Sequence, residues 1–249
     1  MSGVHFLDAR APDGMRLYAI GDVHGRLDLL RAMHAEIRAE LMRDRPDDWR
    51  IVHLGDYVDR GPDSAGVIAF LMERIAEDGR IVALAGNHDM ALLDFLREGD
   101  RTQMFRRFGG NDTARSYGTH VDFATASSAE AGRLALAAAI PLSHLDFLRG
   151  LPRSAEFGDF FFCHAGIRPG VPLDWQDPQD LIWIRDAFLN FPGLHPKVVV
   201  HGHTPQDQAE IMPNRVNLDT LAYASGRLTA LAVDGSKNGS KKRLMEVSE

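Results

Sequence analysis

An acidic side chain and an imidazole stand two residues apart near the start of the chain, in the sequence Gly-Asp-Val-His-Gly at 21–25. They follow the apolar segment 17–20, which is typical of a buried strand. Residues two apart on an extended backbone point to the same side, so Asp22 and His24 can converge on one cation. The flanking glycines permit a tight turn and leave space beside such a site. Asp-x-His is common by chance, so this prediction depends on what recurs downstream.

The same pattern, an apolar segment followed by a ligand-type side chain beside a glycine, recurs four times. Its ligand-type residues are Asp56 in 51–61, Asn87 in 81–89, His164 in 160–166 and His203 in 197–205. In an α/β sheet, functional groups lie in the loops beyond the strand ends. Mixed oxygen and nitrogen donors suit divalent transition ions such as Mn, Fe or Zn. The recurrence therefore indicates a metal site assembled from several strand ends.

The segments between these motifs predict the elements that position them. Apolar residues at three- and four-residue spacing predict amphipathic helices at 27–42 and from Asp63 to about residue 76, so strands and helices alternate as in an α/β protein. Between about 91 and 150 the spacing is helical throughout, with a break at 109–112. We expect a small helical insertion there, beside the metal site, and expect it to influence substrate selectivity.

The two ends of the chain and its second half give weaker patterns. Residues 1–14 and the tail from Ser236 are expected to be loosely held. Residues 177–189, which include Trp183 and Arg185, have helical spacing. Apolar segments predict strands from 160 and 198, and short antiparallel strands at 209–212, 215–218 and 228–233.

Length and composition indicate an ordinary globular protein. A chain of 249 residues with 45% hydrophobic and 25% charged residues fits a single domain spanning 1–249. Its formal net charge of −7 argues against broad binding to nucleic acid or an anionic membrane. The single cysteine, Cys163, excludes an internal disulfide. No secretory signal and no apolar segment of about 20 residues occurs, so we expect a cytoplasmic protein.

Taken in order, the motifs resemble those of the calcineurin-like metallophosphoesterases, and within them the small bacterial and phage-type phosphoprotein phosphatases. The matching motifs are Gly-Asp-x-His-Gly, Gly-Asp-x-x-Asp-Arg-Gly, Gly-Asn-His-Asp, His-Ala-Gly and Gly-His-Thr, which run from residue 21 to about 205. The resemblance implies a two-sheet β-sandwich flanked by helices. It also implies a dinuclear-metal enzyme that hydrolyses phosphomonoesters by direct attack of a metal-bound hydroxide.

By this resemblance, two divalent ions are held, with Mn expected first and Fe or Zn as alternatives. Asp22 and His24 would hold the first ion, and Asp56 would bridge the two. Asn87, His164 and His203 would hold the second. His201 stands two residues before His203 and could be mistaken for the ligand, but the Gly-His-Thr pattern assigns His203.

The resemblance also assigns residues that act on the substrate. His88 directly follows a ligand, and two neighbours on a straight strand cannot both face one ion, so it is free for another task. The family pattern pairs His88 with Asp59 as a proton-donating dyad. Arg60 and Arg185 match its phosphate-binding arginines, since a guanidinium can hold two phosphate oxygens. The resemblance also assigns Asn87 to phosphate binding, in addition to its role as a ligand. Arg185 lies in the looser motif, and an ordinary surface arginine remains the alternative.

Three functions compete at this point. The first is a protein phosphatase acting on phosphoserine, phosphothreonine and also phosphotyrosine, or on phosphomonoesters in general. The second is a symmetrical diadenosine tetraphosphatase, whose second motif lacks the aspartate that Asp59 supplies here. However, Asp89 in Gly-Asn-His-Asp matches the dinucleotide enzyme, where eukaryotic-type protein phosphatases carry glutamate. The third is a non-catalytic binding module, which the intact set of ligands disfavours.

Overall fold

The computed structural model describes residues 3–235 and 241–249, and the strands in these ranges form two sheets of five strands each. The first sheet has parallel strands at one side and antiparallel strands at the other. Its order is β10 (Lys241–Ser248), β9 (Arg227–Asp234), β1 (Met15–Ile20), β2 (Asp48–His53) and β3 (Ile81–Ala83).

The second sheet has a parallel centre with antiparallel edge strands. Its order is β4 (Ser154–Phe157), β5 (Phe160–Cys163), β6 (Val198–His201), β8 (Arg215–Asn217) and β7 (Glu210–Ile211). The predicted α/β fold with two sheets is confirmed.

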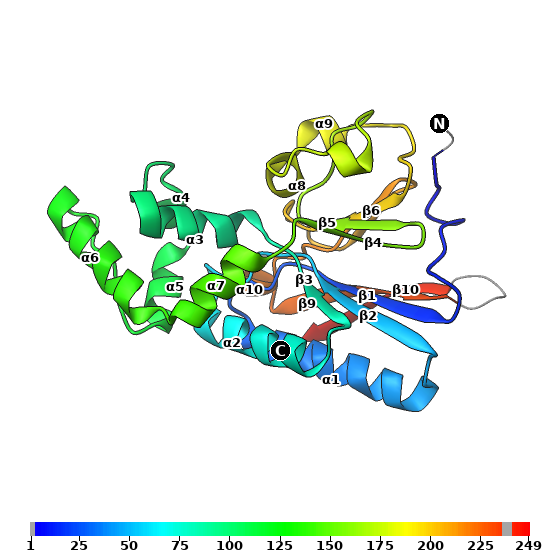
Figure 1. Cartoon of the computed structure of the whole chain (residues 1–249), viewed down its shortest axis with the longest axis horizontal. Coiled ribbons are helices and arrows are strands. Elements are labelled where there is room, and N and C mark those ends of the chain that lie inside the picture. Colours follow the sequence, from blue (N-terminus) through cyan, green and yellow to red (C-terminus); the bar gives the residue numbers. More distant parts are fainter. Residues whose placement is uncertain (1–2, 236–240) are drawn as a thin grey trace.

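The two sheets pack face to face, and the strand alternation decides which side chains enter that core. Leu17 and Ala19 of β1 join Phe160 and Phe162 of β5 in one buried cluster. The alternate residues of β1 face outward and pack with α1 (Leu27–Asp44). Those of β5 pack with α8 (Asp180–Trp183) and α9 (Asp186–Leu189). The result is a sandwich with helices on both outer faces (Figure 1).

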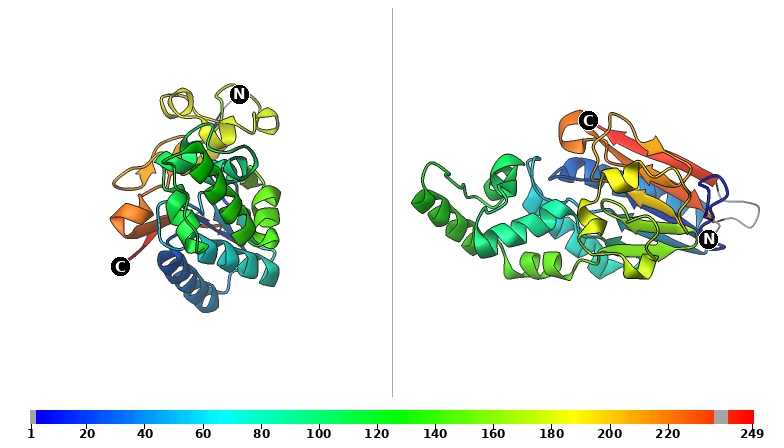
Figure 2. Two further views of the ribbon diagram at one scale, coloured as in Figure 1. Left: turned by 90° about the vertical axis from the view of Figure 1, so that its left-hand side faces the viewer. Right: turned by 90° about the horizontal axis from the view of Figure 1, so that it is seen from above.

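Helix α2 (Ser64–Glu77) begins as predicted, because the Asp63 side chain accepts a hydrogen bond from the Gly66 N–H at 2.8 Å. A helical region follows β3 and extends beyond one end of the sandwich (Figure 2). It comprises α3 (Asn87–Glu98), α4 (Met104–Arg107), α5 (Gly110–Ser116), α6 (Ala126–Ala139) and α7 (Leu142–Gly150). The helical content expected for 91–150 is present, while a single domain for the whole chain stays a prediction.

Five local predictions differ from the structure, some of them only in part. From residue 3 the N-terminal segment is not loosely held, because Phe6, Ala9 and Ala11 are buried in the core between the sheets; residues 1–2 lie outside the described residues. From residue 241 the tail forms β10, which pairs with β9; residues 236–240 lie outside the described residues. The break expected at 109–112 is confined to 108–109, because α5 already begins at Gly110. The helical character expected for 177–189 is present in part, as two short helices. Strand β8 is antiparallel to β7 but parallel to β6.

Asn87 and His88 also differ from expectation, because they begin α3 instead of ending a strand. Separately, no helix among the described residues is long and apolar enough to cross a membrane.

Candidate metal centre

Parallel neighbouring strands bring the sequence motifs to one edge of the sandwich. In the first sheet, Ile20 of β1 pairs with His53 of β2, so the loops with Asp22 and Asp56 leave side by side. In the second sheet, β5 and β6 are likewise parallel neighbours, and His164 and His203 follow them. The carboxyl ends of both sheets therefore supply one cluster.

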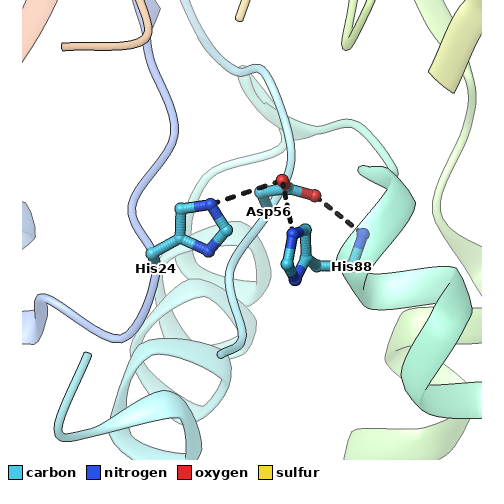
Figure 3. Close-up of side chains that lie close together, drawn as sticks. All are labelled: His24, Asp56 and His88. Carbon is cyan, nitrogen blue, oxygen red and sulfur yellow. Dashed lines mark hydrogen bonds and ion pairs between the residues drawn. The ribbon is translucent and has the colours of Figure 1, made fainter. Parts of the chain in front are cut away.

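Asp56 lies at the centre of this cluster. Its Oδ2 is 3.4 Å from His24 Nε2, and its Oδ1 is 3.4 Å from His164 Nε2 (Figure 3 shows the His24 side). Two groups place their ligand atoms close enough to hold an ion: His24 with Asp56 and His88, and Asp22 with Asp56 and His164. Asp56 belongs to both groups, which is the arrangement expected of a bridging carboxylate.

Backbone carbonyls orient two of the imidazoles. His24 Nδ1 donates to Val58 O at 2.8 Å, and His164 Nδ1 donates to Leu54 O at 2.9 Å. Burial lowers the pKa of His24 to about 3 and also lowers the pKa of His164, so both rings are neutral at pH 7. Each ring therefore presents an Nε2 lone pair toward Asp56, the state that a metal requires.

Asn87 joins the ligands of the two sheets. Its Oδ1 is 2.8 Å from His164 Nε2 and 2.9 Å from His203 Nδ1. The His164 Nε2 lone pair and the amide oxygen are both acceptors, and two acceptors this close are favourable when a cation lies beside them. His201, by contrast, bonds its own neighbour, Gly202 O, and its ring packs on Phe188. The structure thus places His203, and not His201, against Asn87.

Asp22 supplies a further test of whether a metal fits. Its Oδ2 accepts the His203 N–H at 3.0 Å, whereas its buried Oδ1 has no hydrogen-bond partner in the described part of the chain. Burial, and then the charges of Asp219 and Asp56, raise its pKa well above the usual value. A Cβ on Gly202 would overlap Asp22 Oδ1, so only glycine leaves this oxygen free. Crowded carboxylates with an unpaired oxygen fit a divalent cation.

The backbone around the cluster is strained. His24, Asp56, Asp59 and His203 all have positive φ, between 43° and 71°. Non-glycine residues adopt this region rarely and at a cost of about 1–3 kcal/mol each, and such residues concentrate at functional sites. The strain therefore supports a functional role for these loops.

His88 and Asp59 form a buried pair beside the cluster. His88 Nδ1 is 2.7 Å from Asp59 Oδ2, and both residues are about 3% exposed. Burial would lower the pKa of His88, but Asp56 and Asp59 outweigh it and raise that pKa. His88 Nε2 also lies 4.0 Å from Asp56 Oδ2, so this nitrogen faces the cluster (Figure 3).

The two arginines contact different histidines of the cluster. Arg60 Nη2 is 3.2 Å from His88 Nε2, and its guanidinium lies 4.8 Å from the centre of the Tyr223 ring. Arg185 is exposed, and its Nε donates to His203 Nε2 at 3.1 Å. Both guanidinium groups can therefore reach an anion bound at the cluster.

Sequence reasoning missed three residues near the site. Asp219 is buried, and burial raises its pKa to about 6; it follows β8 as the ligand residues follow their strands, so the strand-end pattern could have found it. Tyr223 packs edge-on against His24 with ring centres 5.5 Å apart. Thr113 of α5 bonds Asp59 at 2.7 Å. No local pattern marks the last two.

Known proteins with similar sequences identify the family of this chain. The model of the calcineurin-like phosphoesterase family matches residues 15–232. Serine/threonine-protein phosphatase 1 of Salmonella typhimurium is 28% identical over 224 residues, which cover 88% of this chain and 92% of that protein. An asymmetrical bis(5'-nucleosyl)-tetraphosphatase of Bacillus thuringiensis is 25% identical over 246 residues, covering 87% and 90%.

A solved structure reported as a diadenosine tetraphosphatase candidate superposes with a TM-score of 0.63 at 23% identity, covering 100% of this chain and 98% of that one. This similarity concerns the fold.

The sandwich and its cluster of carboxylate, amide and imidazole donors define a metal-dependent phosphoesterase. The chain belongs to the calcineurin-like phosphoesterase family, and it is a phosphatase that uses divalent metal, not a non-catalytic binding module.

Proposed function

We propose that this protein hydrolyses phosphomonoesters, with phosphoserine and phosphothreonine in proteins as the main substrates and phosphotyrosine as a further one. The observation that carries this proposal is the 2.7 Å hydrogen bond between His88 and Asp59. A fixed imidazole supported by a carboxylate suits the protonation of a poor leaving group.

In this proposal, Asp22 and His24 would hold a first divalent ion, Asn87, His164 and His203 would hold a second, and Asp56 would contribute to both sites. Mn is the expected metal. When bound, such ions polarise the phosphate and make water a stronger nucleophile. The neutral imidazoles and the unpaired oxygen of Asp22 support the binding of divalent metal by these residues.

The substrate-facing residues have separate tasks. Arg60 and Arg185 bind the phosphate oxygens and hold the phosphorus in place. In this structure His88 Nε2 accepts from the Arg60 guanidinium at 3.2 Å. Once Arg60 binds the phosphate instead, His88 would carry a proton on Nε2 and give it to the leaving alkoxide oxygen. Asp59 accepts from Nδ1, which fixes the ring and stabilises its charged form.

The relatives divide between two substrate classes, since one is named a protein phosphatase and another a dinucleotide tetraphosphatase. The leaving group separates these alternatives. Serine and threonine leave as alkoxides, which need a proton, whereas a polyphosphate chain is stable as an anion. Asp59 therefore favours the first class.

Asp89 does not favour the second class, although it matches the dinucleotide enzyme. It is fully buried, and its carboxylate accepts hydrogen bonds from the backbone N–H groups of Asp56, Tyr57 and Gly86. It supports the loop and does not face a substrate.

A direct competition tests the proposal. Purified protein with Mn is assayed on a set of phosphoserine and phosphothreonine peptides and on diadenosine tetraphosphate. We expect a higher kcat/KM for the peptides, and expect Asp59→Ala to impair the peptides more. Asp63→Ala, which changes the α2 cap on the same loop, is the matched control and should impair both substrates equally. A wild-type preference for the dinucleotide, or equal losses in Asp59→Ala, would show that the substrate assignment is wrong.

A further inference from the structure

Thr113 binds both the backbone N–H and the carboxylate of Asp59. It belongs to the helical region and follows Asp59 by 54 residues in sequence. The Asp59 N–H donates to Thr113 Oγ1 at 2.8 Å, and Thr113 Oγ1 donates to Asp59 Oδ1 at 2.7 Å. Thr113 is fully buried and Asp59 is 3% exposed, so water does not substitute for these bonds. One hydroxyl thus fixes the backbone and the carboxylate of the same residue.

The single proton of the hydroxyl determines the direction of the remaining bonds. Because Thr113 donates to Asp59, it must accept from Ser64 Oγ, which lies 3.1 Å away. Ser64 Oγ in turn lies 3.2 Å from the Asp59 N–H. Asp59 Oδ1 is thereby taken by Thr113, and only Oδ2 faces His88. Thr113 of α5 therefore fixes the rotation of the Asp59 carboxylate, and this rotation fixes the orientation of the His88 ring.

The same helical segment supports the rest of the strained loop. Asp59 and Arg60 have φ values of 71° and 68°, and the Arg60 N–H donates to Gly109 O at 3.4 Å. A Cβ on Gly109 would overlap the Arg60 backbone, so glycine permits this approach. Further along, the Ala65 N–H donates to Ser116 Oγ at 3.2 Å. Residues 109–116 therefore contact the loop along its length.

We propose that Thr113 is a positioning residue for proton donation: it holds the Asp59 carboxylate so that His88 points at the leaving oxygen. This inference rests on the proposed roles of His88 and Asp59. It gives the helical region a part in the chemical step, in addition to any part in substrate selection.

Three variants separate positioning from general support. Thr113→Val keeps the shape and removes the hydroxyl, and Thr113→Ser keeps the hydroxyl. Ser116→Ala removes another hydroxyl of α5 that faces the same loop but does not touch Asp59 or His88. Each is measured with Mn on phenyl phosphate, which has a poor leaving group, and on p-nitrophenyl phosphate, which has a good one.

We expect Thr113→Val to lower kcat about tenfold or more on phenyl phosphate, with a smaller loss on p-nitrophenyl phosphate and little change in KM. Thr113→Ser should restore most of the lost rate, Ser116→Ala should lose equally little on both substrates, and bound metal should match the wild type in all three. Equal losses on the two substrates in Thr113→Val, failure of serine to restore the rate, or lost metal would overturn the inference.

A spectroscopic measurement keeps the inference distinct from the proposed function. In full-length protein loaded with diamagnetic Zn, the Nδ1 proton of His88 should give a downfield NMR resonance that His88→Asn removes. Thr113→Val should broaden this resonance or move it upfield, and Ser116→Ala should leave it in place. An unchanged resonance in Thr113→Val would contradict positioning by Thr113. If the wild type instead hydrolyses no phosphomonoester, the proposed function fails whatever the resonance does.

Discussion

Asp56 and Asp89 bind each other's chain segments reciprocally. Asp89 Oδ2 accepts the Asp56 N–H at 2.9 Å, and Asp56 Oδ1 accepts the N–H of His88, the residue before Asp89, at 2.9 Å. The pair connects the left-handed backbone at Asp56 to the N-terminus of α3, where a negative charge is favourable. Asp56 and the backbone of His88 are therefore held by one set of bonds.

Asp89→Asn should destabilise the protein. Asp89→Glu should leave the preference for phosphopeptides over diadenosine tetraphosphate unchanged. An amide offers one oxygen where the carboxylate offers two, so at least one backbone N–H loses its partner, at a cost of about 1–3 kcal/mol in the free energy of unfolding. Urea denaturation measures this. Asp94→Asn, an exposed change on the same helix, is the control. A glutamate variant that exchanged peptide for dinucleotide preference would contradict the supporting role of Asp89.

His88→Asn should lower turnover about 10²–10⁴-fold on phosphoserine peptides, because the proton donor is lost. The loss should be smaller for p-nitrophenyl phosphate, whose leaving group needs little protonation. Steady-state kinetics and measurement of bound metal are made together, with the exposed His120→Asn as the control. If bound metal falls together with activity, His88 is a ligand and not the proton donor.

Removal of metal should abolish hydrolysis of p-nitrophenyl phosphate, and Mn should restore it. Mn should also raise the melting temperature, because a cation relieves the repulsion among Asp22, Asp56 and Asp219. At a Mn concentration about 100 times its Kd, linkage gives about 2.7 kcal/mol, or roughly 5–10 °C. Asp22→Asn should show a smaller shift. Full activity in protein with no measurable metal would contradict the metal assignment.

His195→Phe should make stability less sensitive to acid. His195 is buried, stacks on Phe188 and Phe191, and has a pKa lowered by burial to about 4. The folded state keeps this ring neutral, whereas the unfolded state protonates it below about pH 6.5. The contribution of His195 to the free energy of unfolding is therefore complete above about pH 6.5 and is lost as pH falls from 6.5 toward 4.

The free energy of unfolding that His195 contributes should be about 1–2 kcal/mol lower at pH 5 than at pH 7. Phenylalanine preserves the stacking but does not titrate, so the variant should lose that much less on acidification. Denaturation at both pH values measures the difference. Parallel losses in both proteins would show that His195 does not contribute.

The sequence itself was sufficient to predict that most of the candidate metal ligands lie together. Asp22, His24, Asp56, His164 and His203 each follow a short apolar strand, and parallel strands place such ends together. Local periodicity also gave α1 and α2, because an amphipathic stripe and an aspartate cap are properties of neighbouring residues.

Long-range contacts decided the remainder. The tail becomes β10 because β9 offers a free edge, and the N-terminal segment is ordered because its apolar residues enter the space between the sheets. Neither the pairing of β10 with β9 nor the burial of the N-terminal segment can be recognised from the local sequence. Thr113 shows the same limit at the site: nothing near it distinguishes it from a surface threonine. It contacts Asp59 because packing of α5 on α2 brings together residues 54 positions apart, and a buried hydroxyl there must find its partners on the loop.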